Sequence, residues 1–416
     1  MIMRICCHVI AVLCCVTSLN AADWPQFRGV DSQGVSQATG LPLTWDDASN
    51  LRWKAKLPGA GASSPILLND QLYVTCYSGY GQGTSSSGEL KDLRLHLLAV
   101  SHAEGSIVFD RVIEPTFPET ERVRDHGYAA ATPATDGDAI YVFFGKSGVM
   151  RFTPDGEFVW RTSVGDGTHE WGCGTSPVLF EDLVIVNASV ESGDLVALNK
   201  QSGKEVWRAG GMKASWNTPH LVTLPDGRRE LVVSVRDDIL AFDPATGKSL
   251  WQCQGIPDYV CPSIVSKDGI VYVIGGRQSR AMAIRAGGRG NVTDSHLLWS
   301  ANAGANVCSP VIHGDHLYWV SDRNSVAYCV ALATGEVVYQ ERFPDQPYAS
   351  ALAADGKLYI VTREGGTYVL AASPEYRQLA HNRFADRSTF NASPIVAGND
   401  LILRSDSYLY CIGSDD

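Results

Sequence analysis

The sequence lacks the short motifs that mark most enzyme classes. It contains no Gly-x-Ser-x-Gly nucleophile elbow, no His-Glu-x-x-His zinc helix and no Cys-x-x-Cys or Cys-x-x-Cys-His pair. Hydrolase, zincin, thioredoxin-like and c-type haem chemistry therefore have no support. The glycine-rich run at 79–84 is followed by serines instead of a helix, which indicates a loop between strands and not a phosphate cradle. No catalytic residue and no metal site is predicted.

Positive charge is also scarce. Lys and Arg number 34 against 45 Asp and Glu, which gives a formal net charge of −11, and no basic cluster interrupts this balance. Nucleic acids and anionic membranes bind basic patches, so neither is expected as a partner. One apolar run occurs, within residues 1–22, where Arg4 precedes it and the small residues 21 and 22 follow it. This pattern is typical of a signal peptide and is too short for a membrane span. We expect an exported protein, periplasmic or secreted.

Cysteine pairing is limited by an odd count. Four of the 11 cysteines lie within residues 1–22, and seven remain in the mature chain: Cys76, Cys173, Cys253, Cys261, Cys308, Cys329 and Cys411. An odd number in an exported protein leaves at least one thiol free. A bridge between Cys261 and Cys308 is one alternative, and buried small hydrophobic residues in a sheet are the other.

No segment shows a sustained helical period, and what the chain has instead is a repeat of about 43 residues. Each copy opens with a hydroxyl residue or cysteine before proline or alanine, continues through an Asp/Gly/Asn turn and then has a strand of the Leu-Tyr-Val type. The openings are Ser64-Pro65, Thr132-Pro133, Ser176-Pro177, Thr218-Pro219, Cys261-Pro262, Ser309-Pro310, Ser350-Ala351 and Ser393-Pro394. Short apolar runs bounded by such turn residues predict β-strands. Only the first interval, about 68 residues, is longer than the others.

A strand with a large aromatic residue closes each unit, and this strand decides how the array ends. Trp207 and Trp251 close two units, each after a turn with glycine, whereas the eighth unit stops before its aromatic strand. The missing strand stands at the other end of the chain, at 50–56, where Trp53 lies. We expect it to complete the last sheet and close a ring, since closure removes exposed strand edges. The prediction is an all-β, monomeric, eight-bladed β-propeller of four-stranded antiparallel blades at 50–413, after a signal peptide at 1–22 and an extension at 23–49.

Two phrases carry a resemblance to a known family. The segments 197–207 and 241–251 read Ala-Leu/Phe-Asn/Asp-x-x-Ser/Thr-Gly-Lys-x-x-Trp, and 24–29 reads Trp-Pro-Gln-Phe-Arg-Gly. The first resembles the pyrroloquinoline-quinone (PQQ) repeat, and the second resembles the opening of secreted planctomycete-type proteins with PQQ-like propellers. The resemblance spans about residues 23 to 413. It implies either a quinoprotein dehydrogenase, which holds PQQ and calcium in its central funnel, or a non-enzymatic scaffold similar to BamB.

The residues favour the scaffold. The family's dehydrogenases are expected to hold the quinone beneath an adjacent cysteine pair, and the only such pairs here lie within residues 1–22. No cofactor is therefore expected, and PQQ and calcium enter only with the dehydrogenase alternative. A polysaccharide-binding propeller is a further alternative.

The best candidate surface is the end of the ring where each first strand begins. Loops there lead into the innermost strands, so their side chains should ring the central channel. Aromatic and hydrogen-bonding residues recur at this place in nearly every unit: His126, His169, Glu170, Trp171, Trp216, Tyr259, Asn306 and Tyr348. We predict that they bind a protein, small-molecule or glycan ligand at the channel mouth. The alternative is that the aromatics pack between blades and the polar groups face water.

Overall fold

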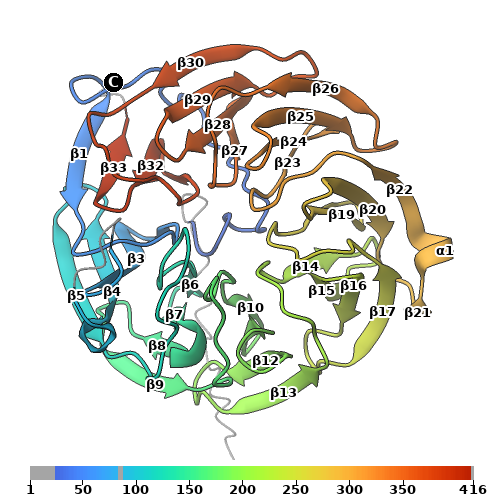
Figure 1. Ribbon diagram of the computed structural model, residues 1–416, viewed down its shortest axis with the longest axis horizontal. Helices are drawn as coiled ribbons and strands as arrows, with labels where there is room; N and C mark the ends of the chain where they lie inside the picture. The colour runs from blue at the N-terminus through green and yellow to red at the C-terminus, as the bar shows by residue number, and fades with distance from the viewer. Residues whose placement is uncertain (1–23, 83–87, 414–416) are drawn as a thin grey trace, which may run out of the picture.

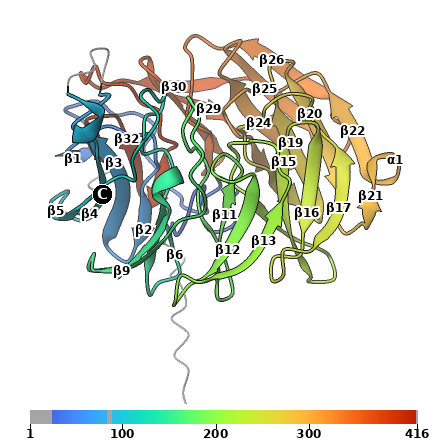
Figure 2. The ribbon, with the colours of Figure 1, turned by 60° about the horizontal axis from the view of Figure 1, so that its bottom comes forward.

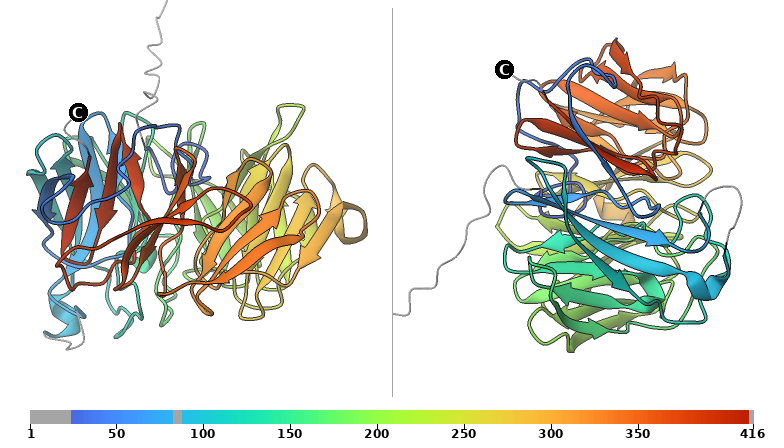
Figure 3. Two further views of the ribbon diagram at one scale, coloured as in Figure 1. Left: turned by 90° about the horizontal axis from the view of Figure 1, so that it is seen from above. Right: turned by 90° about the vertical axis from the view of Figure 1, so that its left-hand side faces the viewer.

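A computed structural model describes residues 24–82 and 88–413. The predicted signal peptide at 1–22 lies outside this range. Eight sheets surround a central opening, as Figure 1 shows, and the edge-on view of Figure 3 shows their strands crossing the thickness of the ring. The eight-bladed propeller is confirmed. Among the described residues, no helix has the length and apolar character needed to cross a membrane.

Each blade is a four-stranded antiparallel sheet, numbered here in chain order from the innermost strand outward. Blade 1 contains β2 (Ile66–Leu68), β3 (Gln71–Ser78), β4 (Arg94–Ser101) and β5 (Ile107–Ile113). Blade 2 contains β6 (Ala134–Thr135), β7 (Ile140–Phe143), β8 (Val149–Phe152) and β9 (Phe158–Thr162). Blade 3 contains β10 (Val178–Phe180), β11 (Leu183–Ala188), β12 (Asp194–Asn199) and β13 (Glu205–Gly210). Blade 4 contains β14 (His220–Thr223), β15 (Arg229–Val235), β16 (Asp238–Phe242) and β17 (Ser249–Gln254).

The second half of the ring repeats this order. Blade 5 contains β18 (Val265–Lys267), β19 (Ile270–Gly275), β20 (Arg280–Arg285) and β22 (Leu297–Ala301). Blade 6 contains β23 (Val311–His313), β24 (His316–Ser321), β25 (Val326–Ala331) and β26 (Val337–Arg342). Blade 7 contains β27 (Leu352–Ala354), β28 (Lys357–Thr362), β29 (Gly366–Ala371) and β30 (Gln378–Asn382), and blade 8 contains β31 (Ile395–Ala397), β32 (Asp400–Arg404) and β33 (Tyr408–Ile412).

Short elements interrupt the pattern in three places. The 3-10 turns η1 (Leu90–Asp92) and η2 (Gly145–Ser147) lie within blades 1 and 2. The two-residue strand β21 (Gly290–Asn291) pairs in parallel with the outer strand β17 of blade 4. It is followed by α1 (Thr293–His296), and Figure 2 shows both at the outer rim.

The N-terminal strand closes the ring as predicted. Strand β1 (Leu51–Lys56) pairs antiparallel with β33, so that Trp53 lies opposite Cys411 and Lys56 opposite Tyr408. Figure 1 shows blue β1 beside red β33. The two ends of the propeller are therefore joined in blade 8, and no blade lacks its outer strand.

In several blades the aromatic residue of the outer strand packs on the next blade, which explains the glycine of the repeat. Trp207 of blade 3 donates its Nε1 hydrogen to the carbonyl oxygen of Pro244 in blade 4, at 3.1 Å. A Cβ on Gly247 would lie 2.5 Å from the Trp207 ring, so the turn must present a bare backbone there. The same stacking joins Trp53 with Gly105, Trp160 with Gly203 and Trp299 with Gly335. These aromatic residues therefore fill the gap between neighbouring sheets.

The hydroxyl residue of each repeat opening joins neighbouring blades around the channel. The backbone amide of Ser176 donates to the hydroxyl of Thr218, for example, and that of Ser309 donates to Ser350, at 3.0 and 2.9 Å. In blade 5 this role falls to Ser263, which accepts from the Thr218 amide, and not to Cys261 at the predicted opening. A small hydroxyl residue recurs here because it satisfies a buried amide of the preceding blade.

The N-terminal extension crosses the end of the channel opposite the mouth. Trp24 forms a backbone bridge with Leu67 of blade 1, and Val35 forms one with Ala353 of blade 7. Between them, the buried Arg28 donates to the carbonyl oxygen of Pro310 in blade 6. Figure 1 shows this dark-blue segment in the central opening. The channel is therefore closed at this end by the chain itself.

The extra length of the first repeat lies in two loops that contact each other. One connects β3 and β4 through η1, and its residues 83–87 lie outside the described range. The other runs from 114 to 133 between blades 1 and 2. The Tyr80 hydroxyl of the first loop donates to the carbonyl oxygen of Glu121 in the second, at 2.7 Å.

Candidate ligand site at the channel mouth

The predicted mouth residues surround one cavity at the centre of the ring. The cavity has a volume of about 360 Å³ and is closed below by Phe27 of the N-terminal extension. Six of the eight predicted residues line it: His126, Trp171, Trp216, Tyr259, Asn306 and Tyr348. The other two, His169 and Glu170, line an adjoining hollow at the rim that Trp171, Trp216 and Tyr259 also border. The structure thus gathers all eight residues, whereas ligand binding by them stays a prediction.

Three aromatic residues from blades 3, 4 and 5 form one wall. The ring centroids of Trp171 and Tyr259 are 4.5 Å apart, and those of Trp171 and Trp216 are 5.1 Å apart. His169 packs edge-on against Trp216 at 4.9 Å. Trp216 is buried, whereas Trp171 and Tyr259 are partly exposed. The wall therefore offers aromatic faces and edges to a ligand while its base is fixed by packing.

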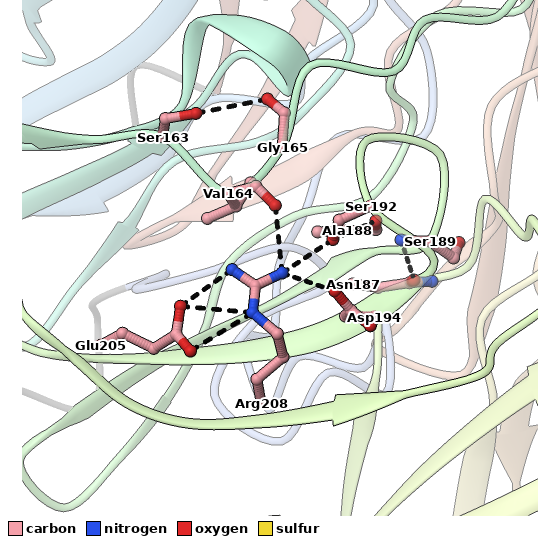
Figure 4. A network of polar contacts seen from close by, with 10 residues as sticks. All are labelled: Ser163, Val164, Gly165, Asn187, Ala188, Ser189, Ser192, Asp194, Glu205 and Arg208. Carbon is pink, nitrogen blue, oxygen red and sulfur yellow. Dashed lines mark hydrogen bonds and ion pairs between the residues drawn. The ribbon is translucent and has the colours of Figure 1, made fainter.

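The loop that carries Trp171 is held at its base by Arg208 of β13 (Figure 4). The guanidinium Nη1 donates to the carbonyl oxygen of Val164 at 3.4 Å and to Asp194 at 2.5 Å, and Nη2 donates to Glu205 at 2.8 Å. These carboxylates raise the pKa of Arg208, Glu205 contributing most. The charged network thus ties the start of the Trp171 loop to blade 3.

The neighbouring loop that carries Trp216 is held by Asn187 of β11. The Asn187 Nδ2 donates to the hydroxyl of Ser215 at 3.0 Å and to the carbonyl oxygen of Asn217 at 3.1 Å. Its Oδ1 accepts from the Ser189 amide at 3.2 Å, a contact drawn in Figure 4. Because all of these groups are buried, Asn187 fixes the backbone on both sides of Trp216.

Across the cavity, the loop at 114–133 spans part of the mouth. His126 of this loop lies with its Nδ1 3.0 Å from the hydroxyl of Tyr348, which precedes blade 7. Asp125 forms an ion pair with Arg363 at 3.0 Å, and its carbonyl oxygen accepts from Asn391 Nδ2 at 2.7 Å. The loop leaves blade 1 and enters blade 2, yet its tip is fastened to blades 7 and 8.

Burial sets the protonation of this side of the cavity. It lowers the pKa of His126 to about 4, so that the imidazole is neutral at pH 7. Burial also raises the pKa of Tyr348 well above its ordinary value. A neutral imidazole and a neutral phenol therefore face each other, and each retains polarity without net charge.

Asn306 and Tyr259 form the polar link between the two sides. The Tyr259 hydroxyl donates to Asn306 Oδ1 at 2.5 Å. The buried Asp322 accepts from the backbone amides of Asn306 and Val307, both at 2.8 Å. Burial raises the pKa of Asp322, and these amides oppose the shift.

Three arginines at the mouth were missed from the sequence. Arg277 lies over the ring of Tyr259 with its guanidinium carbon 4.8 Å from the centroid, and Arg363 lies over Tyr348 at 5.1 Å. Arg124 pairs with Glu170 at 2.9 Å. Arg277 and Arg363 follow the second strands of blades 5 and 7, whose ends lie on the same face as the starts of the first strands. The strand order of an antiparallel meander was the signal that could have found these two.

The donor set at the mouth does not fit a calcium-bound quinone. All seven described cysteines are free and none adjoins another in sequence, so the expected paired cysteines are missing from the described chain. Within that same part, the one group of three His, Cys, Asp or Glu ligand atoms close enough for a metal lies away from the mouth, between blades 8 and 1. The mouth instead combines aromatic faces, guanidinium groups, carboxylates and neutral hydrogen-bonding groups, which suits recognition.

Comparison with known proteins decides the family. The sequence model of a family described as outer membrane protein assembly factor BamB matches residues 145–379. The chain belongs to this family. The BamB of Burkholderia pseudomallei is 22% identical over 340 residues, which cover 75% of this chain and 80% of that protein. The BamB of Salmonella typhimurium is 27% identical over 139 residues, which cover 30% of this chain and 35% of that protein.

Solved structures agree on the fold. The crystal structure of BamB from Moraxella catarrhalis superposes with a TM-score of 0.61 at 13% identity, covering 88% of this chain and 97% of that one. A europium-containing methanol dehydrogenase superposes with a TM-score of 0.65 at 10% identity, covering 92% and 89%. At these identities the likeness shows the propeller and leaves its use open.

Proposed function

We propose that this protein is an exported, non-catalytic scaffold of the BamB family that holds a segment of a partner protein at the channel mouth. The observation that carries the proposal is the aromatic wall of Trp171, Trp216 and Tyr259 beside a cavity of about 360 Å³ that Phe27 closes from below. A cavity of this size suits a few side chains of a bound segment, and the blind end keeps the ligand at the mouth.

A protein ligand is supported by the chemistry of the rim. Arg124, Arg277 and Arg363 lie there together with Asp125, Asp258 and Glu170, so both signs of charge are available around an aromatic centre. Such a centre with a polar rim is typical of protein recognition sites. The family match, to an outer membrane protein assembly factor, supports the same class of ligand.

The experiment is site-specific photo-crosslinking in the native envelope. A photoreactive amino acid at Asn306, in the mouth, is compared with one at Val206, an exposed residue of the outer strand β13. We expect one protein adduct from the mouth position that is absent from the outer position. The double variant Trp171→Ala, Trp216→Ala is expected to abolish this adduct. An adduct that survives the double variant contradicts a binding role for the aromatic wall.

Two alternatives are separated by titration of the purified protein. With PQQ and calcium we expect no saturable quenching of tryptophan fluorescence, because the described part of the chain has no adjacent cysteines and no cluster of three acidic, histidine or cysteine ligand atoms at the mouth. Saturable quenching at micromolar concentration would favour a quinoprotein dehydrogenase instead. Binding of oligosaccharides that depends on Trp171 and Trp216 would favour a polysaccharide-binding propeller.

A further inference from the structure

Three potential metal ligands meet where the ring closes, on the face opposite the mouth. His102 follows the third strand of blade 1, Asp400 begins β32, and Cys411 lies near the end of β33 in blade 8. The imidazole Nε2 of His102 lies 3.0 Å from Asp400 Oδ2. One ligand atom from each of His102, Asp400 and Cys411 lies within 4.8 Å of the other two. Asp400 and Cys411 are buried, whereas His102 is partly exposed.

The groups around this cluster are arranged as they are around metal ligands in other proteins. The second imidazole nitrogen of His102, Nδ1, lies 3.6 Å from Asp70 Oδ1, an ion-pair distance, and a carboxylate beside this nitrogen favours metal binding through the other one. The other oxygen of Asp400, Oδ1, is paired with Arg52 Nε at 3.2 Å. Asp400 Oδ2 is thus the oxygen directed toward His102.

The charges also balance. A thiolate and a carboxylate supply two negative charges to a divalent ion, and the neutral imidazole supplies none. The outer charges of Arg52 and Asp70 offset each other. Nitrogen, sulfur and oxygen ligands in this combination suit zinc, whose tetrahedral sites accept three protein ligands and a water.

The corresponding position between another pair of blades has different side chains. Between blades 2 and 3, Lys200 stands where His102 stands and pairs with Asp136 at 3.2 Å. Arg151, opposite Trp160, occupies the place that Cys411 occupies opposite Trp53. At this junction an ammonium group therefore pairs with the acid, and a guanidinium group replaces the thiol, so the metal-ligand set is not repeated. This junction therefore has neither the thiol nor the imidazole found between blades 8 and 1.

A cysteine alone does not account for the cluster. Cys329 in blade 6 lies opposite Tyr339 at the position that corresponds to Cys411, but the residue of blade 7 that corresponds to His102 is Ala372. The combination of all three ligand types occurs where the chain's two ends meet.

We propose that His102, Asp400 and Cys411 bind a divalent transition-metal ion, with zinc the best match, and that this ion clips blade 8 to blade 1. The ligands come from the first repeat and from the last, so the bound ion joins the two ends of the propeller. Trp53 of the closing strand reinforces the site, because its Nε1 donates to the carbonyl oxygen of His102 at 2.7 Å. A ligand that binds only the folded ring stabilises that ring by mass action.

The test uses the purified chain after removal of metals under reducing conditions. Cobalt(II) is added as a spectroscopic probe, because thiolate ligation produces a charge-transfer absorption that carboxylate or imidazole ligation lacks. We expect one cobalt per chain with this absorption, and its displacement by one equivalent of zinc. The unfolding midpoint should rise with zinc concentration.

Three variants give the test its controls. Cys411→Ala places at this position the residue that blade 3 has in Ala197 opposite Trp207, and it should lose the charge-transfer band. His102→Lys reproduces the Lys200–Asp136 pair, so it should fold and lose metal-dependent stabilisation. Cys329→Ala should keep both properties. The absence of stoichiometric binding, or a thiolate band that survives Cys411→Ala, overturns the proposal.

Discussion

The Nδ1 atom of His126 lies 3.0 Å from the hydroxyl of Tyr348, although 222 residues separate them in the chain. This contact fastens the loop at 114–133 across part of the mouth, and the ion pair of Asp125 with Arg363 supports it. A ligand that enters the cavity therefore passes beside a loop that is joined to blades 1 and 2 at its ends and held to blade 7 at its tip.

The partly buried His126 predicts a pH dependence of stability. Burial lowers its pKa to about 4, whereas the unfolded chain protonates near 6.5. The unfolded chain therefore takes up the proton first, and stability is lost as the pH falls from about 6.5 to about 4. We expect the free energy of unfolding of the natural protein to fall by about 1–3 kcal/mol relative to His126→Phe over this range. Urea unfolding at a series of pH values measures both. A difference that does not change with pH contradicts this account.

Glu191 predicts a pH dependence of stability of the opposite sense, in which stability is lost as the pH rises. It is buried, one of its carboxyl oxygens has no hydrogen-bond partner among the described residues, and burial raises its pKa to about 8. Its unfolded pKa is near 4.3, so the unfolded chain releases the proton first as the pH rises. Stability should therefore be lost between about pH 4.5 and 8, by on the order of 2–4 kcal/mol relative to Glu191→Gln. Thermal unfolding of the two proteins at pH 5, 7 and 9 measures it, and parallel curves would show that Glu191 ionises normally.

The stacking of Trp207 on Gly247 predicts a steric cost that a matched variant isolates. In Gly247→Ala the new Cβ meets the ring at 2.5 Å, at a φ of 69°. Gly227, in the same blade, has a φ of 83° and nothing within 4 Å of its Cβ position, so Gly227→Ala carries the backbone strain alone. We expect Gly247→Ala to be less stable than Gly227→Ala by about 1–3 kcal/mol. Equal losses in denaturant titrations would mean that the ring contact is easily displaced.

Asn187 predicts a coupling between a buried amide and the aromatic wall. Asn187→Ala leaves the Ser189 amide and the Asn217 carbonyl oxygen without their side-chain partner, at a cost of about 1–3 kcal/mol. The Trp216 loop should loosen, so near-ultraviolet circular dichroism should weaken more than the far-ultraviolet signal. Asn291→Ala, at an exposed asparagine of β21, serves as the control and should change neither. An unchanged tryptophan signal in Asn187→Ala would show that packing alone fixes Trp216.

The sequence predicts which aromatic residues lie at the mouth, but not the contacts that these residues make there. Trp171, Trp216 and Tyr259 precede first strands at regular spacing, so their meeting at one end of the ring follows from the repeat. The arginines Arg277 and Arg363 escaped notice because they follow second strands, which lie on the same face only after the meander has folded. The length of the loop at 114–133 does not indicate that its tip reaches blade 7.

The sequence by itself determined the eight blades, the antiparallel order and the closure by the strand that contains Trp53. These features depend on local alternation, turn residues and a constant period, all of which act over a few tens of residues. Tertiary structure alone decided that Phe27 closes the channel, that His126 meets Tyr348 and that His102 meets Asp400 and Cys411. Each of these contacts joins residues from distant repeats, and the repeat pattern is the same whichever side chains the closed ring brings face to face.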